Sequence, residues 1–152
     1  MVRETMKKTM FIGPVGSGKT TLYQRLFDLP MDYVKTQSLE FYGEVVDTPG
    51  EYLENRNYYS ALLVTSMGVD VVALVMDCMD TQTVYPPGFT RMFTRPTLGI
   101  VTKIDLLDGD EGDSYAETSL RMAGVNQVVR TSSLENRGID EIRAVLAERP
   151  AP

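Results

Sequence analysis

The sequence predicts an α/β fold, a doubly wound sheet of about six strands that are mostly parallel, with one antiparallel strand. Apolar runs of strand length alternate with runs of helical periodicity along the 152 residues. The run from 69 to 76 is almost wholly apolar, as expected of a central strand that helices cover on both faces. A chain of this length suits one core, so residues 1–152 are expected to form a single domain.

Each element follows from its own stretch of sequence. Short apolar runs predict strands at 8–13, 38–42, 44–47, 70–77, 97–102 and 127–131. Runs with apolar residues three and four apart predict helices at 18–28, 54–66, 87–94, 114–123 and 138–148. In the first helix, the apolar stripe contains Leu22, Tyr23, Leu26 and Phe27. Gly43 permits a tight hairpin between the second and third strands, which supplies the antiparallel pair.

Composition limits the classes of function. The net charge of −6 argues against broad nucleic-acid binding, which needs a basic surface. No apolar run is long enough to cross a membrane, and the N-terminal residues lack the apolar stretch of a signal peptide. The single cysteine, Cys78, cannot form an internal disulfide, so we expect a cytoplasmic protein. The chain has no histidine, so catalysis has to rest on positioning, a metal ion, carboxylates or water.

One motif identifies the first class of ligand. Residues 13–20 follow the pattern G-x-x-x-x-G-K-T between a predicted strand and a predicted helix, which is the context of a phosphate-binding P-loop. Lys19 can reach the β- and γ-phosphates of a nucleoside triphosphate, and the Thr20 hydroxyl can bind Mg²⁺. The expected nucleotide contacts in this segment are Gly13, Pro14, Val15, Gly16, Ser17, Gly18, Lys19, Thr20 and Thr21.

A second motif, Asp47-Thr48-Pro49-Gly50, follows an apolar strand. In a P-loop protein, an aspartate at this strand end can hold Mg²⁺, usually through water. Gly50 can offer its backbone N–H to the γ-phosphate with no side chain in the way. The sequence by itself is also typical of a turn, so it gains meaning from its place after the P-loop.

Two further segments predict the base site, residues 102–105 (Thr-Lys-Ile-Asp) and residues 131–134 (Thr-Ser-Ser-Leu). The Asp105 carboxylate can accept hydrogen bonds from guanine N1–H and the 2-amino group, and adenine offers neither donor. The Lys103 stem can lie over the base. The expected base contacts are Thr102, Lys103, Asp105, Ser132, Ser133 and Leu134. The predicted ligands are therefore Mg²⁺ with GTP or GDP, and ATP stays open as an alternative.

The order of these motifs resembles the small GTPase superfamily, although Thr102 stands where its usual fourth motif has asparagine. The strings KTQSLEF at 35–41, DTPGEY at 47–52 and YSAL at 59–62 resemble the ethanolamine- and propanediol-utilisation family EutP/PduV over essentially the whole chain. The resemblance implies cytosolic bacterial proteins associated with metabolic microcompartments. It also implies ATP binding as an alternative, because a small-carboxylate kinase role has been attached to the family name.

Two residues near the γ-phosphate carry the expected switch. The Thr36 hydroxyl would join Mg²⁺ only in the triphosphate state, so hydrolysis would release residues 29–37; a loop threonine without a ligand is the alternative. Glu51 stands where many GTPases have a water-orienting glutamine. A carboxylate is repelled by the γ-phosphate, so Glu51 is expected to point away and hydrolysis to be slow. The expected metal contacts are Thr20, Thr36 and Asp47, and the catalytic candidates are Lys19, Thr36, Gly50 and Glu51.

Three functions compete at this point. The first is a Mg²⁺-dependent GTP-binding switch whose residues 29–60 contact a partner, such as a shell or enzyme protein of a microcompartment. The second is a kinase that passes the γ-phosphate to a small carboxylate such as acetate, and the third is a non-catalytic assembly scaffold. The aromatic and arginine residues of 79–96 could form an interface or pack inward, and so could Tyr58 and Tyr59.

Overall fold

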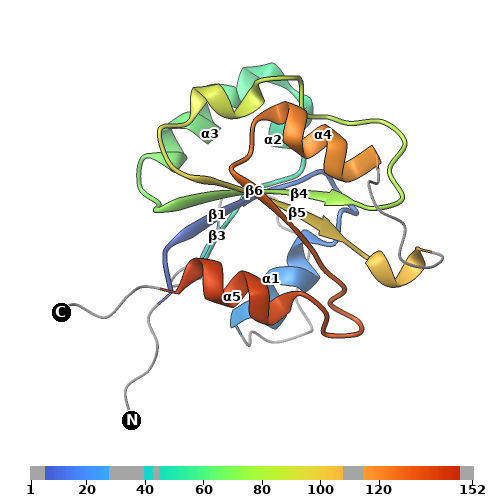
Figure 1. The fold of residues 1–152 in the computed structure, drawn as a ribbon. Helices are drawn as coiled ribbons and strands as arrows, with labels where there is room; N and C mark the ends of the chain where they lie inside the picture. Colours follow the sequence, from blue (N-terminus) through green and yellow to red (C-terminus); the bar gives the residue numbers. More distant parts are fainter. Residues whose placement is uncertain (1–5, 28–39, 43–44, 108–114, 148–152) are drawn as a thin grey trace, which may run out of the picture.

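The computed structural model describes residues 6–27, 40–42, 45–107 and 115–147 (Figure 1). Among these residues, six strands form one sheet in the order β2-β3-β1-β4-β5-β6. The strands are β1 (Thr9–Ile12), β2 (Glu40–Tyr42), β3 (Val45–Asp47), β4 (Val71–Asp77), β5 (Thr97–Thr102) and β6 (Gln127–Arg130). β2 pairs antiparallel with β3, and every other neighbouring pair is parallel. The predicted fold class, including the single antiparallel strand, is confirmed.

Helices cover both faces of the sheet, with α1 and α5 on one face and α2, α3 and α4 on the other (Figure 1). The helices are α1 (Lys19–Phe27), α2 (Glu51–Glu54), α3 (Tyr59–Ser66), α4 (Tyr115–Ala123) and α5 (Ile139–Leu146), with 3₁₀ turns η1 (Arg56–Tyr58), η2 (Phe89–Met92) and η3 (Ile104–Leu106). None of the helices in the described ranges is long and apolar enough to cross a membrane.

The predicted helix at 54–66 was wrong as a single element. Asn55 has an extended backbone, with φ −122° and ψ 115°, and its side chain accepts a hydrogen bond from the N–H of Asn57. This cap ends α2 and starts the turn that leads into α3, because an asparagine side chain competes with helical hydrogen bonding. The predicted helix at 87–94 is only the 3₁₀ turn η2.

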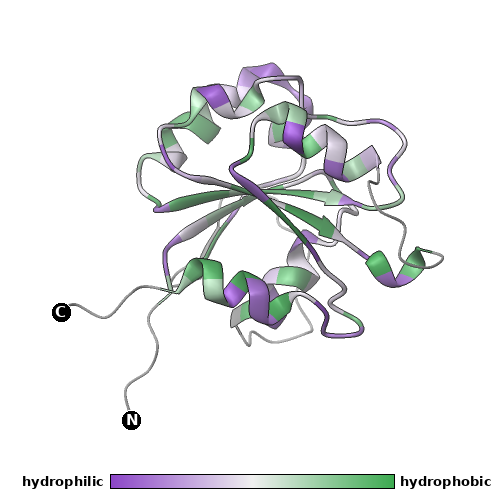
Figure 2. Cartoon of the chain, in the orientation of Figure 1, coloured by the Kyte–Doolittle hydropathy of each residue, from purple (hydrophilic) through white to green (hydrophobic). Residues whose placement is uncertain are grey.

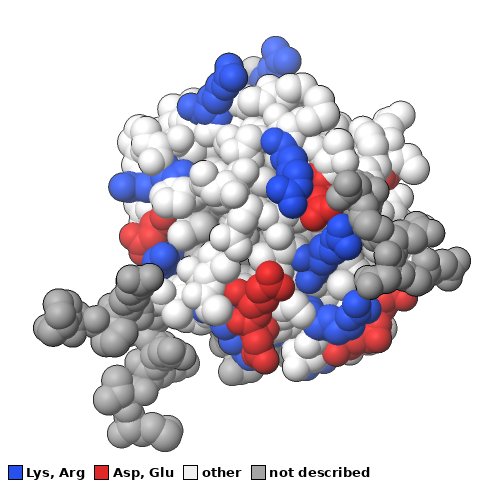
Figure 3. Space-filling view, in the orientation of Figure 1, with Lys and Arg blue, Asp and Glu red and all other residues white. Residues whose placement is uncertain are grey.

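The core has two layers, one on each face of the sheet. Strands β4 and β5 are apolar along most of their length, whereas the helices mix apolar and polar residues (Figure 2). Six of the seven residues of β4 are buried, as expected of a central strand. On the outside, acidic and basic side chains lie beside one another (Figure 3), as in the exposed ion pair of Arg143 and Asp140 at 3.2 Å.

The aromatic residues of the segment 79–96 pack inward. Tyr85, Phe89 and Phe93 are buried, and the rings of Phe89 and Phe93 meet edge to face at 5.7 Å. Tyr59 packs against Phe89 at 5.6 Å, so it belongs to the same core layer. Tyr58 is 40% exposed and its ring stacks on that of Tyr52. Of the two alternatives, core packing therefore holds for these buried aromatics and for Tyr59.

Candidate functional site

The P-loop connects the end of β1 to the start of α1, at the edge where the parallel strands end. Gly16 and Gly18 have φ values of +83° and +86°, which only glycine adopts without strain. The loop borders a cleft of about 590 Å³, lined by residues 14–21 together with Gly50, Glu51 and Lys103. This cleft is the candidate nucleotide site, and it brings the first two motifs together.

Lys19 lies on the floor of this cleft, where it contacts the end of β3. Its ammonium group is 3.1 Å from Asp47 Oδ1 and donates a hydrogen bond to the Thr48 carbonyl. Burial lowers the pKa of Lys19, and attraction to the Asp47 carboxylate offsets part of that lowering. The candidate phosphate-binding lysine and the candidate magnesium-binding aspartate thus form a buried ion pair.

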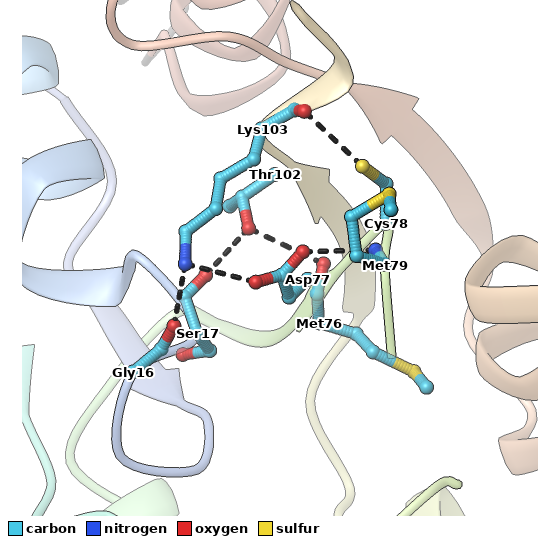
Figure 4. A network of polar contacts seen from close by, with 8 residues as sticks. All are labelled: Gly16, Ser17, Met76, Asp77, Cys78, Met79, Thr102 and Lys103. Atoms are coloured by element: carbon cyan, nitrogen blue, oxygen red, sulfur yellow. Dashed lines mark hydrogen bonds and ion pairs between the residues drawn. The ribbon is translucent and has the colours of Figure 1, made fainter. Parts of the chain in front are cut away.

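Thr102 and Lys103, from the predicted base segment 102–105, contact the backbone of the P-loop (Figure 4). The Thr102 hydroxyl donates to the Ser17 carbonyl at 2.5 Å. The Lys103 ammonium donates to the Gly16 carbonyl at 2.7 Å and pairs with Asp77 at 2.8 Å. The side chains of Thr102 and Lys103 therefore fix the loop backbone, which is a role that the sequence did not suggest for either residue.

Two more residues complete this network (Figure 4). They are Asp77, the last residue of β4, and Cys78, which follows it. Asp77 Oδ1 accepts a hydrogen bond from the N–H of Met79, and Asp77 Oδ2 accepts one from the Lys103 ammonium group. The Cys78 thiol donates to the Lys103 carbonyl at 3.1 Å. Burial raises the pKa of the Cys78 thiol, and the charges of Asp77 and Asp105 raise it further.

The two predicted base segments meet at the end of the sheet. The Ser132 hydroxyl donates to Asp105 Oδ1 at 2.7 Å, and the Ile104 N–H donates to the Thr131 carbonyl at 3.1 Å. The carboxylate is half-buried, and one of its oxygens is held by Ser132. Leu134, by contrast, is 80% exposed at the tip of its loop. Asp105 is thus oriented by the segment that follows β6.

The second motif packs directly onto the P-loop. A Cβ added to Gly50 would lie 2.6 Å from the backbone nitrogen of Val15, which leaves no room for a side chain. Glu51 is exposed, begins α2 and lines the cleft. Thr36 lies outside the described residues.

The donor set at the cleft fits Mg²⁺. Within the described ranges, no group of three or more Asp, Glu, His or Cys residues could hold a metal ion. Mg²⁺ keeps several waters and takes nucleotide oxygens, so it needs only one or two protein ligands. Thr20 lines the cleft, and the buried Asp47 carboxylate is the ion-pair partner of Lys19, which also lines it. The Thr20 hydroxyl and the Asp47 carboxylate are oxygen ligands of the required kind.

One contact of this site was missed from the sequence. The Tyr23 hydroxyl donates to Asp47 Oδ2 at 3.0 Å, and both residues are fully buried. Tyr23 was placed in an apolar stripe, where a tyrosine ring is ordinary. Its position four residues after Lys19 was the available signal, because residues at that spacing share a helix face.

A glycine loop between β1 and α1, an aspartate at the end of β3 and the segments after β5 and β6 define a P-loop protein with a small GTPase-like fold. The chain belongs to the ethanolamine utilisation–propanediol utilisation family, PduV-EutP, whose family model matches residues 6–148. The predicted family is confirmed.

Curated relatives agree with this assignment. The chain is 44% identical over 137 residues to the propanediol utilization protein PduV of Citrobacter freundii, covering 90% of this chain and 91% of that protein. It is 37% identical over 108 residues to a protein of Salmonella typhimurium named "Probable acetate kinase EutP", covering 69% of this chain and 67% of that protein.

Solved structures support the same fold. The selenocysteine-specific elongation factor EF-Sec from a bacterium matches with a TM-score of 0.66 and 19% identity over 92% of this chain. A Roco2 RocCORdC structure from Methanosarcina barkeri, bound to GDP, matches with a TM-score of 0.54 and 19% identity over 95% of this chain. The chain spans 28% of the first of these structures and 50% of the second.

Proposed function

We propose that this protein is a Mg²⁺-dependent GTP-binding switch with slow GTP hydrolysis that serves ethanolamine or propanediol utilisation. The observation that carries the proposal is the physical connection between the phosphate loop and the base segment. Lys103 contacts the Gly16 carbonyl, and Thr102 contacts the Ser17 carbonyl. One ligand that spans the cleft and the end of β5 would touch both elements, as a nucleotide does.

Guanine is the proposed base, because Asp105 presents a carboxylate at the end of this connection. Ser132 donates to one oxygen of that carboxylate, and an oxygen has further lone pairs with which to accept from guanine. Ser133 and Leu134 would lie along the base edge. The GDP in the Roco2 RocCORdC structure belongs to that protein and agrees with this choice.

In the bound state, Lys19 would exchange its contacts with Asp47 and Thr48 for the β- and γ-phosphates. Mg²⁺ would be held by Thr20 and Asp47, with Thr36 joining in the triphosphate state. The metal supplies positive charge to the phosphate oxygens when it is bound. The N–H of Gly50 would reach the γ-phosphate, so this contact of the second motif would form only when a triphosphate is bound.

Slow hydrolysis follows from Glu51. Glu51 is exposed and lines the cleft, and the γ-phosphate would repel its carboxylate, so Glu51 is a poor water-positioning group. Single-turnover GTPase assays on wild type and Glu51→Gln test this role. Fast turnover by the wild-type protein would contradict it, and equal slow rates would remove Glu51 from the mechanism.

A small-carboxylate kinase is the second candidate, favoured by the name of the 37% identical Salmonella protein. Such an enzyme needs a cation for the acceptor carboxylate near the γ-phosphate. Among the described residues, no arginine lines the cleft, and its cations are Lys19 and Lys103. Lys19 is assigned to the phosphates, and Lys103 contacts Gly16 and Asp77. Arg95 donates to the Met67 carbonyl at 2.9 Å, against α3. The geometry therefore favours the switch.

The proposed partner is a shell or enzyme protein of a microcompartment in the cytoplasm, contacted through residues 29–60. The described part of this region includes Tyr58, stacked on Tyr52. Both tyrosines lie next to the second motif, so a γ-phosphate at Gly50 could change their position.

The proposed function is tested by binding of fluorescent GDP in the presence of Mg²⁺, with GTP and ATP as competitors. GTP should compete at least about tenfold better than ATP, which is the discrimination expected from unpaired polar groups at a base site. Adding acetate with GTP or ATP and assaying acetyl phosphate separates the switch from the kinase. Formation of acetyl phosphate, or equal competition by ATP and GTP, would overturn the switch.

A further inference from the structure

A tyrosine of the P-loop helix contacts the aspartate that ends β3. Tyr23 and Lys19 are four residues apart on α1, so both side chains leave the same face of the helix. Lys19 Nζ is 3.1 Å from Asp47 Oδ1, and the Tyr23 hydroxyl donates to Asp47 Oδ2 at 3.0 Å. Two side chains of one helix therefore hold the two oxygens of one carboxylate.

Burial makes this contact consequential. Tyr23 and Asp47 are both fully buried, and a buried carboxylate needs donors around it to remain charged. The Tyr23 ring also packs on Phe11, with ring centroids 6.0 Å apart. The ring alone would fill that space, and phenylalanine would do so equally well. The hydroxyl aimed at Asp47 is therefore the part of Tyr23 that packing does not require.

The two donors differ in what nucleotide binding would do to them. Lys19 would turn to the phosphates and give up its contact with Asp47 Oδ1. Tyr23 belongs to the core layer that contains Leu22 and Phe11 and is not among the residues that line the cleft, so a bound nucleotide would not draw its hydroxyl away from Asp47. Its hydrogen bond would persist while the other oxygen of Asp47 turns to the water shell of the metal.

We propose that Tyr23 is a positioning residue whose hydroxyl orients Asp47 to receive the Mg²⁺ of a bound nucleotide. The inference rests on the proposed function, since it presumes a magnesium–nucleotide ligand in the cleft. Tyr23 acts through Asp47 and touches neither metal nor nucleotide. Its loss should therefore change the dependence of binding on Mg²⁺ more than the binding of nucleotide alone.

The test is a Mg²⁺ titration of the affinity for fluorescent GDP, with EDTA as the metal-free reference. Tyr23→Phe keeps the ring and removes the hydroxyl. Tyr85→Phe is the matched control, because Tyr85 is buried to a similar degree, but its single O–H is directed at backbone carbonyls and not at a carboxylate. The carbonyl oxygens of Val75 and Ile12 lie 2.7 and 3.0 Å from the Tyr85 hydroxyl. Urea denaturation establishes that each variant is folded.

Tyr23→Phe should raise the Mg²⁺ concentration at half effect roughly tenfold, as expected when a hydrogen bond to a charged group is lost. Affinity in EDTA should change by less than about twofold, and Tyr85→Phe should leave the Mg²⁺ midpoint at the wild-type value. In an Asp47→Asn background, adding Tyr23→Phe should produce no further shift, because the two residues act as one unit.

The outcomes separate the inference from the function on which it rests. A wild-type Mg²⁺ midpoint in Tyr23→Phe, or an equal shift in Tyr85→Phe, overturns the role of Tyr23 and leaves nucleotide binding intact. A full additional shift in the Asp47→Asn background also overturns it. Absence of Mg²⁺-dependent GDP binding by the wild-type protein overturns both the inference and the proposed function.

Discussion

Replacing Gly50 with alanine tests whether the second motif is pressed against the P-loop. Gly50 has φ −57° and ψ −30°, a backbone conformation that alanine adopts without strain. The added Cβ would lie 2.6 Å from Val15 N, 2.8 Å from Val15 Cγ2 and 3.0 Å from the Pro14 carbonyl carbon. The substitution therefore perturbs only the contact between the two segments.

The geometry sets the expected size of the effect. The optimal separation of nonbonded carbon atoms is about 3.5–4.0 Å. The new methyl group would therefore overlap Val15 N and the Pro14 carbonyl carbon, which are backbone atoms and cannot rotate away. Overpacking of this kind costs about 1–3 kcal/mol. For a domain of this size, each kcal/mol lowers the melting temperature by roughly 2–4 °C.

Urea denaturation measures the effect as a lower midpoint with an unchanged slope. Gly68→Ala is the matched control, because a Cβ at Gly68 would meet nothing closer than the Thr65 carbonyl at 3.7 Å. Its stability should stay within about 0.5 kcal/mol of wild type, as for most surface changes. If Gly50→Ala proves as stable as Gly68→Ala, the close contact between the second motif and the P-loop is refuted.

Three further predictions concern Asp77, Tyr85 and Cys78. Asp77→Asn should lower the free energy of unfolding, measured by urea denaturation, by at most about 1 kcal/mol, because its partner Lys103 is partly exposed. This loss should be smaller in 1 M salt. A larger loss that is the same with and without salt would contradict the prediction. Burial raises the pKa of Tyr85 well above its ordinary value of 10.0, so unfolded Tyr85 ionises first and wild-type stability should fall above pH 10. Denaturation of wild type and Tyr85→Phe between pH 9 and 11 should show their stabilities converging; a constant difference would be the contrary result. The buried Cys78 thiol, with its raised pKa, should react with iodoacetamide at least about tenfold more slowly in the native protein than in urea, and equal rates would show that the thiol is accessible.

Local pattern was sufficient for the sheet and for the motifs. The strands, the P-loop and the ends of β3, β5 and β6 carry signals within a few residues, so the sequence placed them correctly. The meeting of Asp105 and Ser132 was also foreseeable, because the carboxyl ends of neighbouring parallel strands lie at one edge of a sheet.

The contacts between motifs were not foreseeable in the same way. Tyr23, Asp77 and Tyr85 use their polar atoms on partners 10 to 73 positions away in the sequence. The sequence offered a simple explanation for the presence of each residue. Tyr23 lies in an apolar stripe, Asp77 at the end of a strand and Tyr85 in a loop rich in aromatic residues. Periodicity shows which face a side chain occupies, but the direction of a hydroxyl or carboxylate depends on tertiary packing. The break at Asn55 was missed because helical periodicity continues through it.

The central claim is that Asp105 reads a guanine base in a nucleotide held by the P-loop. It is tested most directly by the affinities of wild type and Asp105→Asn for GDP and for xanthosine diphosphate, both with Mg²⁺. An asparagine amide can donate to the 2-oxo group of xanthine, whereas it meets the 2-amino group of guanine with a donor. We predict that the substitution weakens GDP binding at least about tenfold and strengthens binding of xanthosine diphosphate. Unchanged GDP affinity in Asp105→Asn would contradict the assignment of the base site.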